Sequence, residues 1–506
     1  MKIYYWILFS LWMLSLFSCT FSDTALSKNQ VQTGTATISG RVVNASLKEK
    51  DRPIIFILQF YNPITTKNAE YKTSLLEDGS FTFEVPVECK CIGFLYSDIY
   101  YGGLCLVPNE ETKLTITFDE KRQPNIDMNS NMGLTVEDLK NLNEVSGEVL
   151  TATQNDVNLS LKQNIQPSEY SEFIINKWEN DYLPIVDKST KLSNGAKQIL
   201  KNSLRLFYLD NNLLNYENKI DSSYALDKSY YSFLKKFHLN NAQYLYSDYF
   251  YYNVLQSILS NKTFNIPRIG DMPIENWLKI VTTSIADLIG TDSGFFYDMI
   301  VNYAYVEQFN DETKPLSNKQ IQNIKNYFTN KSFVDILLTE NEKITKVADI
   351  TSHLTVNETP SISKEELTAV QNNKQPQGKL IDTIVSKYKG NVVIIDFGAT
   401  WCAPCLQGMR ESRPLKQEML DKNVVFVYIT EDSSPKELWK KKIQGIGGEH
   451  YYLTGKEWES ISYSDKYGFE GIPTYLIFDS NGKLEHKITT YPGNEKMRAM
   501  IEKLLL

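Results

Sequence analysis

The stretch VVIIDFGATWCAPC, residues 392–405, constrains the fold of this chain more than any other part of the sequence. Its apolar residues from Val392 to Phe397 predict a buried strand, and a short turn leads from this strand into a helix that begins near Cys402. Two residues separate Cys402 from Cys405, so the second sulfur lies about one helical turn further along, close enough for a disulfide. The pattern therefore predicts an α/β domain with a dithiol at the start of a helix.

The position of Cys402 favours its ionised form, because unpaired amides and the macrodipole stabilise an anion at a helix N-terminus. We therefore expect Cys402 to be the nucleophile and Cys405 to be the buried thiol that resolves the mixed disulfide. Asp396 is a carboxylate inside the apolar strand, where it is costly to bury without a role. We interpret it as the group that takes or relays the proton of Cys405. The alternative is that Asp396 only caps the turn at the end of the strand.

A second short stretch, GFEGIPTYLIF, places Pro473 directly before another predicted strand. Pro473 has no backbone N–H, and a cis bond between Ile472 and Pro473 would let the proline lie against the sulfurs. The backbone of Ile472 would then be free to pair with an incoming peptide.

The pattern of apolar and polar residues changes along the chain and predicts a multidomain protein. Short alternating strands come first, then helical periodicity, then a polar connector, and last a pattern of alternating strands and helices. The predicted segments are a signal segment, a small β-sandwich-like all-β domain, a mainly helical domain, the connector and an α/β domain that overlaps it, at residues 1–18, 35–120, 134–350, 352–379 and 361–506.

Two features of the β and helical regions have alternative interpretations. Cys105 could form a disulfide with Cys89 or Cys91, or all three thiols could be small core residues. The tyrosine-rich run at residues 241–255 could bind a carbohydrate or peptide, but at helical spacing we favour core packing. Local signals also predict a turn at Asp78-Gly79, a helix start after Ser193 and a helix end at Gly290.

The N-terminal sequence MKIYYWILFSLWMLSLFSC has one lysine, an apolar run and then Cys19, which is the layout of a signal peptide. The apolar run is shorter than the ~20 residues of a membrane-spanning helix. Its ending resembles a bacterial lipobox, so we expect Cys19 to be lipidated and to anchor the protein in the cell envelope, facing the periplasm. The alternative is an ordinary signal peptide with Cys19 incidental.

The charge balance argues against a nucleic-acid partner. The chain has 53 basic and 61 acidic residues and a net charge of −8, and no basic patch stands out. The four histidines are scattered without metal-ligand spacing. We expect no metal and no cofactor besides the redox-active disulfide of Cys402 and Cys405.

The motifs DFGATWCAPC and GIPT resemble the active-site pair of the thioredoxin superfamily, and the material between them resembles the exported TlpA and ResA type. The resemblance covers residues 361–506, and the whole layout is similar to TlpA-family disulfide reductases of Bacteroidetes. It implies a thioredoxin-like fold and an exported reductase of envelope protein disulfides, recharged by an upstream thiol carrier. The catalytic residues it implies are Cys402, Cys405 and Asp396. The substrate-binding residues it implies are Trp401, Ala403, Pro404, Ile472 and Pro473.

Three departures from the family pattern bear on the site. Gly398 stands where the family often has tryptophan, which predicts looser packing beside the sulfurs. Arg410 stands where a proline is common and Pro414 follows later, which predicts a shifted helix kink. The strand NVVFVYIT, residues 423–430, lacks the lysine that partners the buried acid of thioredoxin, so the proton affinity of Asp396 is open.

Two other functions use the same dithiol. A thiol peroxidase is one, but the sequence lacks PxxxTxxC because Thr400 lies two residues before Cys402. A copper or haem-pathway thiol chaperone is the other, although no histidine accompanies the motif and a stable metal site would need outside ligands.

Overall fold

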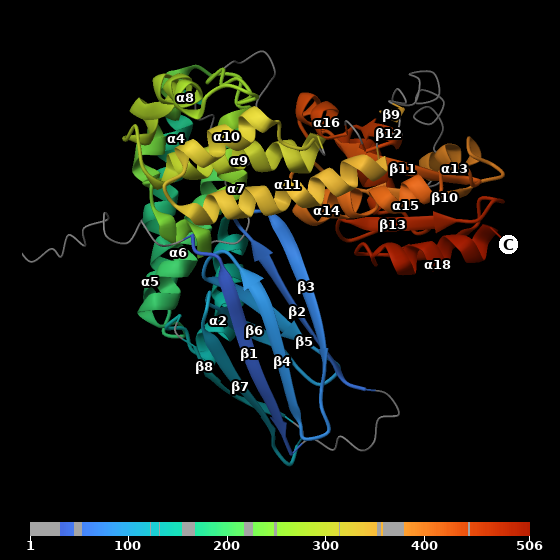
Figure 1. The fold of residues 1–506 in the computed structure, drawn as a ribbon, viewed down its shortest axis with the longest axis horizontal. Coiled ribbons are helices and arrows are strands. Elements are labelled where there is room, and N and C mark those ends of the chain that lie inside the picture. The colour runs from blue at the N-terminus through green and yellow to red at the C-terminus, as the bar shows by residue number, and fades with distance from the viewer. Residues whose placement is uncertain are drawn as a thin grey trace, which may run out of the picture.

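The structure is a computed structural model, and the prediction of an N-terminal β domain, a helical middle and a C-terminal α/β domain is confirmed (Figure 1). The signal segment, Cys19 and most of the connector lie outside the described residues. The described residues are 31–44, 53–121, 123–130, 132–153, 167–216, 226–246, 250–312, 314–351, 356–357, 379–443 and 446–505.

The strands of the N-terminal domain form two four-stranded sheets within the described residues, and their alternating apolar side chains pack together between the sheets. The first sheet has the order β4 (Ser80–Val87), β1 (Gly34–Val43), β7 (Glu111–Phe118) and β8 (Pro124–Asn129). The second has the order β3 (Lys67–Ser74), β2 (Ile55–Asn62), β5 (Cys91–Tyr96) and β6 (Tyr101–Leu106). Strand β8 extends this domain beyond its predicted end at residue 120.

The structure tests two local predictions for this domain, the turn at Asp78-Gly79 and the state of its three thiols. The turn at Asp78-Gly79 forms, with φ +80° at Gly79, but it connects β3 and β4, which belong to different sheets. The thiols of Cys89, Cys91 and Cys105 are buried and not disulfide-bonded, so the interpretation as core residues holds. Burial raises the pKa of Cys89 well above its usual value, which keeps this thiol protonated.

The middle of the chain is a helical domain whose core continues into the sandwich, where Cys89 and Cys105 join it. Ser193 caps α6 by accepting the N–H of Ala196, and Gly290, with φ +86°, ends α8. Tyr244 and Tyr251 of the tyrosine-rich run are buried, which favours core packing. The elements are α2 (Val136–Thr153), α4 (Pro167–Lys177), η2 (Trp178–Tyr182), α5 (Leu183–Lys188), α6 (Asn194–Tyr208), η3 (Leu209–Leu214), η5 (Lys228–Phe237), η6 (Ala242–Tyr246), α7 (Phe250–Ser260), α8 (Ile274–Ile289), α9 (Phe295–Glu312), α10 (Asn318–Tyr327) and α11 (Lys331–Thr351).

The C-terminal domain is built on a sheet with helices on both faces. The sheet has the order β14 (Leu484–Ile488), β13 (Thr474–Phe478), β10 (Val392–Phe397), β11 (Val424–Glu431), β12 (Gly448–Leu453) and β9 (Val356–Asn357). The helices are α13 (Lys379–Ser386), α14 (Ala403–Glu411), α15 (Arg413–Glu418), α16 (Lys436–Lys442), α17 (Gly455–Ser462) and α18 (Asn494–Leu505). Helices α13 and α17 cover one face, and α15 and α18 cover the other. Strand β10 lies in the interior of the sheet and is buried along its whole length.

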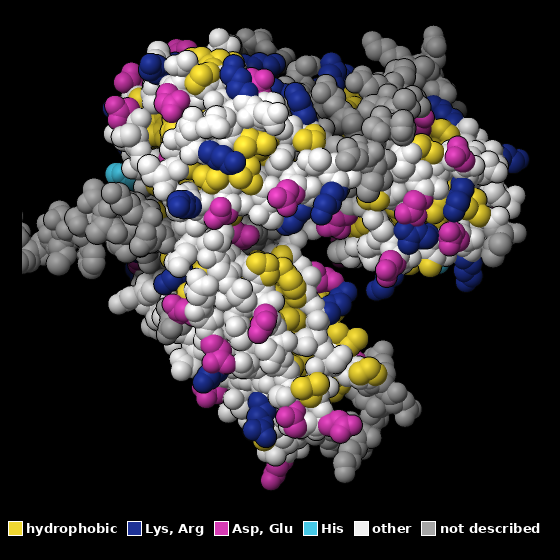
Figure 2. Space-filling model, in the orientation of Figure 1, with side chains coloured by type: hydrophobic (Ala, Val, Ile, Leu, Met, Phe, Trp, Pro, Cys, Tyr) yellow, Lys and Arg dark blue, Asp and Glu magenta, His cyan; other side chains and the backbone are white. Residues whose placement is uncertain are grey.

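The surface has no strongly one-signed region on the face drawn in Figure 2, where basic and acidic side chains are interspersed. The same view shows an indentation between the sandwich and the C-terminal domain. None of the described helices is both long and apolar enough to cross a membrane.

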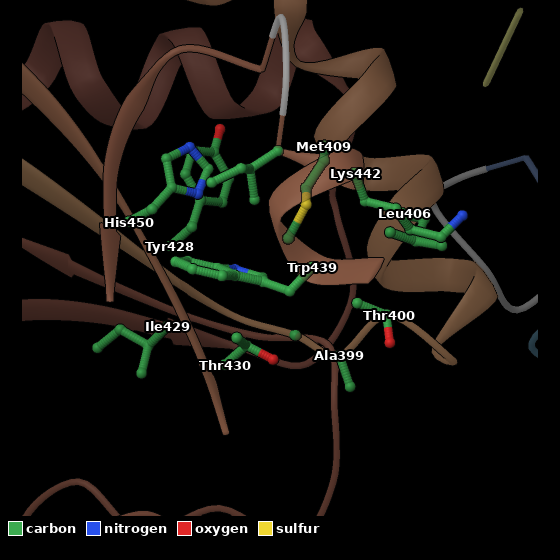
Figure 3. A pocket seen from close by; sticks show the side chains of 12 residues that line it. Ala399, Thr400, Leu406, Met409, Tyr428, Ile429, Thr430, Trp439, Lys442 and His450 are labelled. Carbon is green, nitrogen blue, oxygen red and sulfur yellow. The ribbon is translucent and has the colours of Figure 1, made fainter. Parts of the chain in front are cut away.

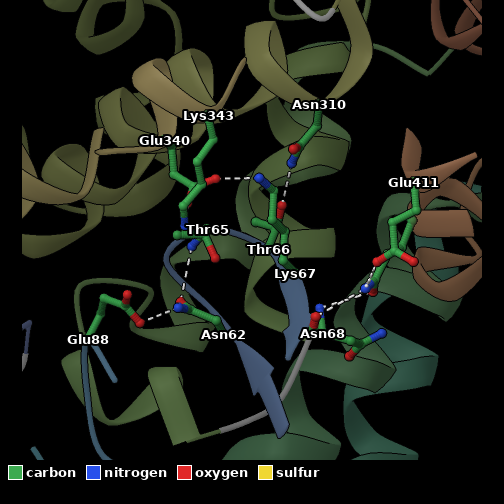
Figure 4. Close-up of polar contacts among 11 residues, drawn as sticks. Asn62, Thr65, Thr66, Lys67, Asn68, Glu88, Asn310, Glu340, Lys343 and Glu411 are labelled. Carbon is green, nitrogen blue, oxygen red and sulfur yellow. Dashed lines mark hydrogen bonds and ion pairs between the residues drawn. The ribbon is translucent and has the colours of Figure 1, made fainter. Parts of the chain in front are cut away.

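The turn between β2 and β3 joins the three parts of the molecule (Figure 4). Asn302 of α9 donates to the carbonyl oxygen of Ile64 at 2.9 Å, and Asn310 of the same helix donates to Thr66 Oγ1 at 2.7 Å. All of these polar groups are buried, so each hydrogen bond offsets a desolvation cost. They fix the turn against the helical domain.

The beginning of β3, directly after this turn, also contacts α14 of the C-terminal domain. The N–H of Asn68 donates to Gln407 Oε1 at 3.1 Å, and Gln407 Nε2 donates back to the carbonyl oxygen of Asn68 at 3.0 Å. One side-chain amide thus pairs with the edge of β3 as a neighbouring strand would. The helix that begins at the dithiol is therefore held against the sandwich.

An ion pair strengthens this junction. Lys67 pairs with Glu340 of α11, whose side chain is 6% exposed, and Lys343 donates to the same carboxylate at 2.7 Å. Burial alone would raise the pKa of Glu340, but the two ammonium groups lower it below its usual value. Glu340 is therefore ionised at neutral pH.

We expect Glu340→Ala to destabilise the protein by about 3 kcal/mol, because it leaves the half-buried ammonium of Lys67 without its anion. Denaturant unfolding of the full chain measures the change. Glu342→Ala, at an exposed position of the same helix, is the control and should change the stability by less than about 0.5 kcal/mol. Equal effects of the two substitutions would contradict a structural role for the ion pair.

Candidate active site

The two thiols meet where β10 leads into α14. Cys402 is the N-cap of the helix, and its Sγ accepts the backbone N–H of Cys405 at 3.3 Å. The two cysteines form a disulfide, with Cα atoms 5.3 Å apart. Cys402 is 5% exposed and Cys405 is fully buried. Of the two cysteines, only Cys402 therefore keeps a small exposed fraction, and the helix N-terminus stabilises negative charge on its sulfur.

The loop before the helix is held by two serines that the sequence analysis did not single out. The N–H of Thr400 donates to Ser434 Oγ at 3.0 Å, and Trp401 Nε1 donates to Ser433 Oγ at 2.9 Å. Both serines follow β11, the parallel neighbour of β10, so the loops after the two strands lie together. The ring of Trp401 nevertheless remains 53% exposed beside the dithiol.

The predicted substrate-binding residues come from two segments, one around the start of α14 and one directly before β13. The Ile472–Pro473 peptide bond is cis, and Ile472 packs against Ala399, Cys402 and Cys405. Pro404 is exposed in the first turn of α14. Ala403 is the first residue of that helix.

Asp396 lies on β10, the strand that leads to the dithiol, on the face of the sheet that α15 and α18 cover. It is 4% exposed, and its direct neighbours in the sheet are Tyr428 of β11 and Tyr475 of β13. Within the described residues, its Oδ1 has no hydrogen-bond partner. Burial raises the pKa of Asp396 to about 8. Its proton affinity is thus close to that of a thiol, which suits proton exchange with Cys405.

Side chains pack more closely beside the sulfurs than we expected from the glycine at position 398. A Cβ atom at Gly398 would lie 3.1 Å from the Cβ of Cys405 and 3.2 Å from the Cε of Met409. The expectation of loose packing is therefore wrong, because α14 itself fills this space. The expected shift of the helix kink is present: α14 ends at Glu411, and α15 begins with Pro414 in its first turn.

A small cavity lies beside the loop, between α14, α16 and the sheet (Figure 3). Its volume is about 20 Å³, and its lining includes Thr400, Tyr428, Trp439 and His450. A cavity of this size holds about one water molecule. An organic cofactor would not fit there.

Comparisons with known proteins point to one domain of the chain. Residues 390–484 match the family model described as thioredoxin-like. The chain is 30% identical over 121 residues to an uncharacterised protein of Haemophilus influenzae, and the match covers 24% of this chain and 77% of that protein.

Several solved structures are also similar to the chain. A thioredoxin-family thiol:disulfide interchange protein of Chlorobium tepidum is 23% identical with a TM-score of 0.21, covering 24% of this chain and 84% of its own. StoA of Bacillus subtilis is 18% identical with a TM-score of 0.19, covering 22% and 82%. The exposed lipoprotein thioredoxin Etrx1 of Streptococcus pneumoniae is 21% identical with a TM-score of 0.20, covering 24% and 90%.

The raised pKa of Asp396 predicts a pH-dependent stability. Its carboxyl group has a pKa of about 8 in the folded protein and about 4 in the unfolded chain. The folded state therefore holds this proton more tightly, so the contribution of Asp396 to stability is full below about pH 4 and is lost as the pH rises to about 8.

We expect Asp396→Asn to remove this loss. The variant should match the wild type near pH 4 and exceed its stability at pH 8, by on the order of a few kcal/mol. Calorimetry of the oxidised proteins at both pH values measures the difference. An unchanged difference between the two pH values would show that Asp396 does not titrate as the geometry indicates.

Proposed function

Because the chain belongs to the thioredoxin-like family through its C-terminal domain, we propose that it is a thiol-disulfide oxidoreductase that reduces disulfide bonds of exported proteins. One observation carries the proposal: Cys402, which caps a helix N-terminus and keeps a small exposed fraction, is bonded to the fully buried Cys405. This asymmetry gives the two thiols different tasks.

The proposed cycle begins with the thiolate of Cys402. It attacks a substrate disulfide, forms a mixed disulfide and releases the first substrate thiolate. Cys405 then passes its proton to the carboxylate of Asp396, and its thiolate attacks the sulfur of Cys402. The mixed disulfide breaks, the Cys402–Cys405 disulfide forms, and the second substrate sulfur leaves as a thiolate that takes up a proton. Two electrons have moved from the dithiol to the substrate.

The direction, the partners and the location are part of the same proposal. The resemblance to TlpA-family disulfide reductases supports reduction of substrates, so an upstream thiol carrier must return two electrons to the dithiol. The exposed ring of Trp401 and the backbone of Ile472 are proposed to contact the substrate polypeptide. The signal-peptide layout and Cys19 support export and lipid anchoring.

The two alternative functions have less support. A peroxidase needs the threonine of PxxxTxxC beside its reactive cysteine, and Thr400 is one position out of that register. For a metal chaperone, the described residues contain no group of three or more His, Cys, Asp or Glu side chains placed to hold a metal ion. Neither alternative accounts for the buried position of Asp396.

We expect Cys402→Ser to abolish disulfide exchange and Cys405→Ser to accumulate a mixed disulfide, because the second variant can attack but not resolve. Reduction of insulin disulfides measures exchange, and mass spectrometry detects the adduct. Cys91→Ala removes a buried thiol of the sandwich and should retain exchange. Turnover by Cys402→Ser would refute the assignment.

The reduction potential of the Cys402–Cys405 pair decides the direction of electron flow. We expect a value near that of thioredoxin, about −270 mV, as a reductant requires. Equilibration with glutathione and dithiothreitol buffers measures it. A value near about −120 mV, as in a strong oxidant, would reverse the proposed direction.

A further inference from the structure

The outer edge of β3 is a row of backbone groups beside α14, the helix that begins at the dithiol. β3 stands at the end of its sheet, and within the described residues no strand pairs with its outer side. The N–H and the carbonyl oxygen of Asn68 both point to that side, because both bind the side-chain amide of Gln407 (Figure 4). Every second residue of a strand points its backbone groups the same way, so those of Glu70 and Lys72 also face outward.

A proline or a covering helix protects the other edge strands of the sandwich against pairing with a further chain. Pro86 lies on β4 and Pro124 begins β8, and a proline has no N–H to donate. Leu139 of α2 packs against Gly103 of β6, so a helix lies against that strand. β3 has eight residues without proline and pairs with β2 in one unbroken register. Its outer edge therefore keeps the geometry that an added strand needs.

The side chains of β3 indicate which kind of segment fits beside it. On the exposed face, Glu70 pairs with Lys72 at 2.7 Å, so these two charges balance each other. On the opposite face, Ala69 and Tyr71 pack against the core of the sandwich but stay half-buried, and the ring of Tyr71 stacks with that of Phe60. An added strand would cover these two residues with apolar side chains of its own. The edge therefore favours an extended segment in which every second residue is apolar.

The free part of this edge lies within reach of the dithiol. Gln407 follows Cys402 by five residues in α14, which is a rise of about 8 Å along the helix. An extended polypeptide spans that rise in about three residues, and about two more bring it from Asn68 to Glu70. Glu70 is close enough to Lys496 of α18 for their charges to interact, so the edge borders the indentation between the sandwich and the C-terminal domain (Figures 1 and 2).

We propose that the outer edge of β3, at Glu70 and Lys72, binds an extended segment of the substrate polypeptide as an added strand while Cys402 attacks the substrate disulfide. This inference rests on the proposed function and names its substrate class, which is incompletely folded proteins with exposed apolar segments near their cysteines. Main-chain hydrogen bonds give the affinity, and the apolar positions that cover Ala69 and Tyr71 give the preference. In a folded substrate the same segment is already paired and buried, so it does not bind here.

The test uses the reduced full-length protein and a short synthetic peptide of alternating apolar and polar residues. Its central cysteine is joined by a disulfide to 2-nitro-5-thiobenzoate. The thiolate of Cys402 attacks the peptide sulfur, a bond forms between these two sulfurs, the original disulfide breaks, and the aromatic group leaves as a coloured thiolate. The reference substrate, 5,5′-dithiobis(2-nitrobenzoate), has the same leaving group and no peptide.

The decisive variant is Glu70→Pro, which removes an outward N–H and places a proline ring on the edge without breaking a bond to β2. We expect the peptide concentration at half-maximal rate to rise about tenfold, because a few main-chain hydrogen bonds are lost. The maximal rate should not change. Glu70→Ala loses the same side chain but keeps the N–H, so this matched control should behave as the wild type. With the reference substrate, all three proteins should react at the same rate.

A second measurement needs no substitution on the edge. In the mixed disulfide that Cys405→Ser forms with the peptide, the amides of residues 67–74 should exchange with deuterium more slowly than in the adduct with 2-nitro-5-thiobenzoate alone. Two complementary sets of peptides, each N-methylated at every second residue, add a control. Only one set should lose the protection, since only alternate N–H groups of an added strand face β3.

The outcomes separate the two proposals. Equal half-maximal concentrations for Glu70→Pro and Glu70→Ala, together with unchanged exchange at residues 67–74, would overturn the binding role of β3. If the wild type releases no thiolate from either substrate, the proposed function itself is wrong. If Glu70→Pro does not fold, the exchange measurement on Cys405→Ser decides the role of β3 alone.

Discussion

The cost of removing the carboxylate of Asp396 from water is the constraint on which the candidate site of the C-terminal domain depends. Asp396 lies on an interior strand, with tyrosines beside it on both neighbouring strands and helices over that face. A charge at such a place costs several kcal/mol unless the surroundings compensate it. A more stable domain would carry an apolar residue here, so the fold gives up stability at the residue that we propose as the proton acceptor.

The segment that carries the dithiol contacts both of the other domains. Gln407 of α14 pairs with the edge of β3, and α15 packs against α11. The reactive end of the C-terminal domain therefore lies at a junction of three parts, with Trp401 exposed next to it. Under the proposed function, a substrate polypeptide would meet a composite surface here, whereas an isolated domain of this fold would offer the dithiol alone.

Local patterns in the sequence predicted most of what depends on neighbouring residues. The strand ending at Phe397, the helix cap at Ser193 and the helix end at Gly290 follow from apolar periodicity and from the conformational needs of single residues. Contacts between distant segments were not predictable in the same way. Gln407 reaches the edge of β3 only through the packing of α14 against the sandwich, and the Asp78-Gly79 turn gives no information on which sheet each flanking strand joins.

The contacts of the β2–β3 turn also set an order of folding events. They join residues far apart in sequence, with separations of 238 for Asn302 and Ile64, 244 for Asn310 and Thr66, and 339 for Gln407 and Asn68. Contacts of such long range form late, since the closure entropy of the intervening chain opposes them. A ribosome delivers the sandwich first, so the backbone groups of Asn68 bind water until the last domain emerges. The docking of α14 onto the beginning of β3 is thus the last of these contacts to form.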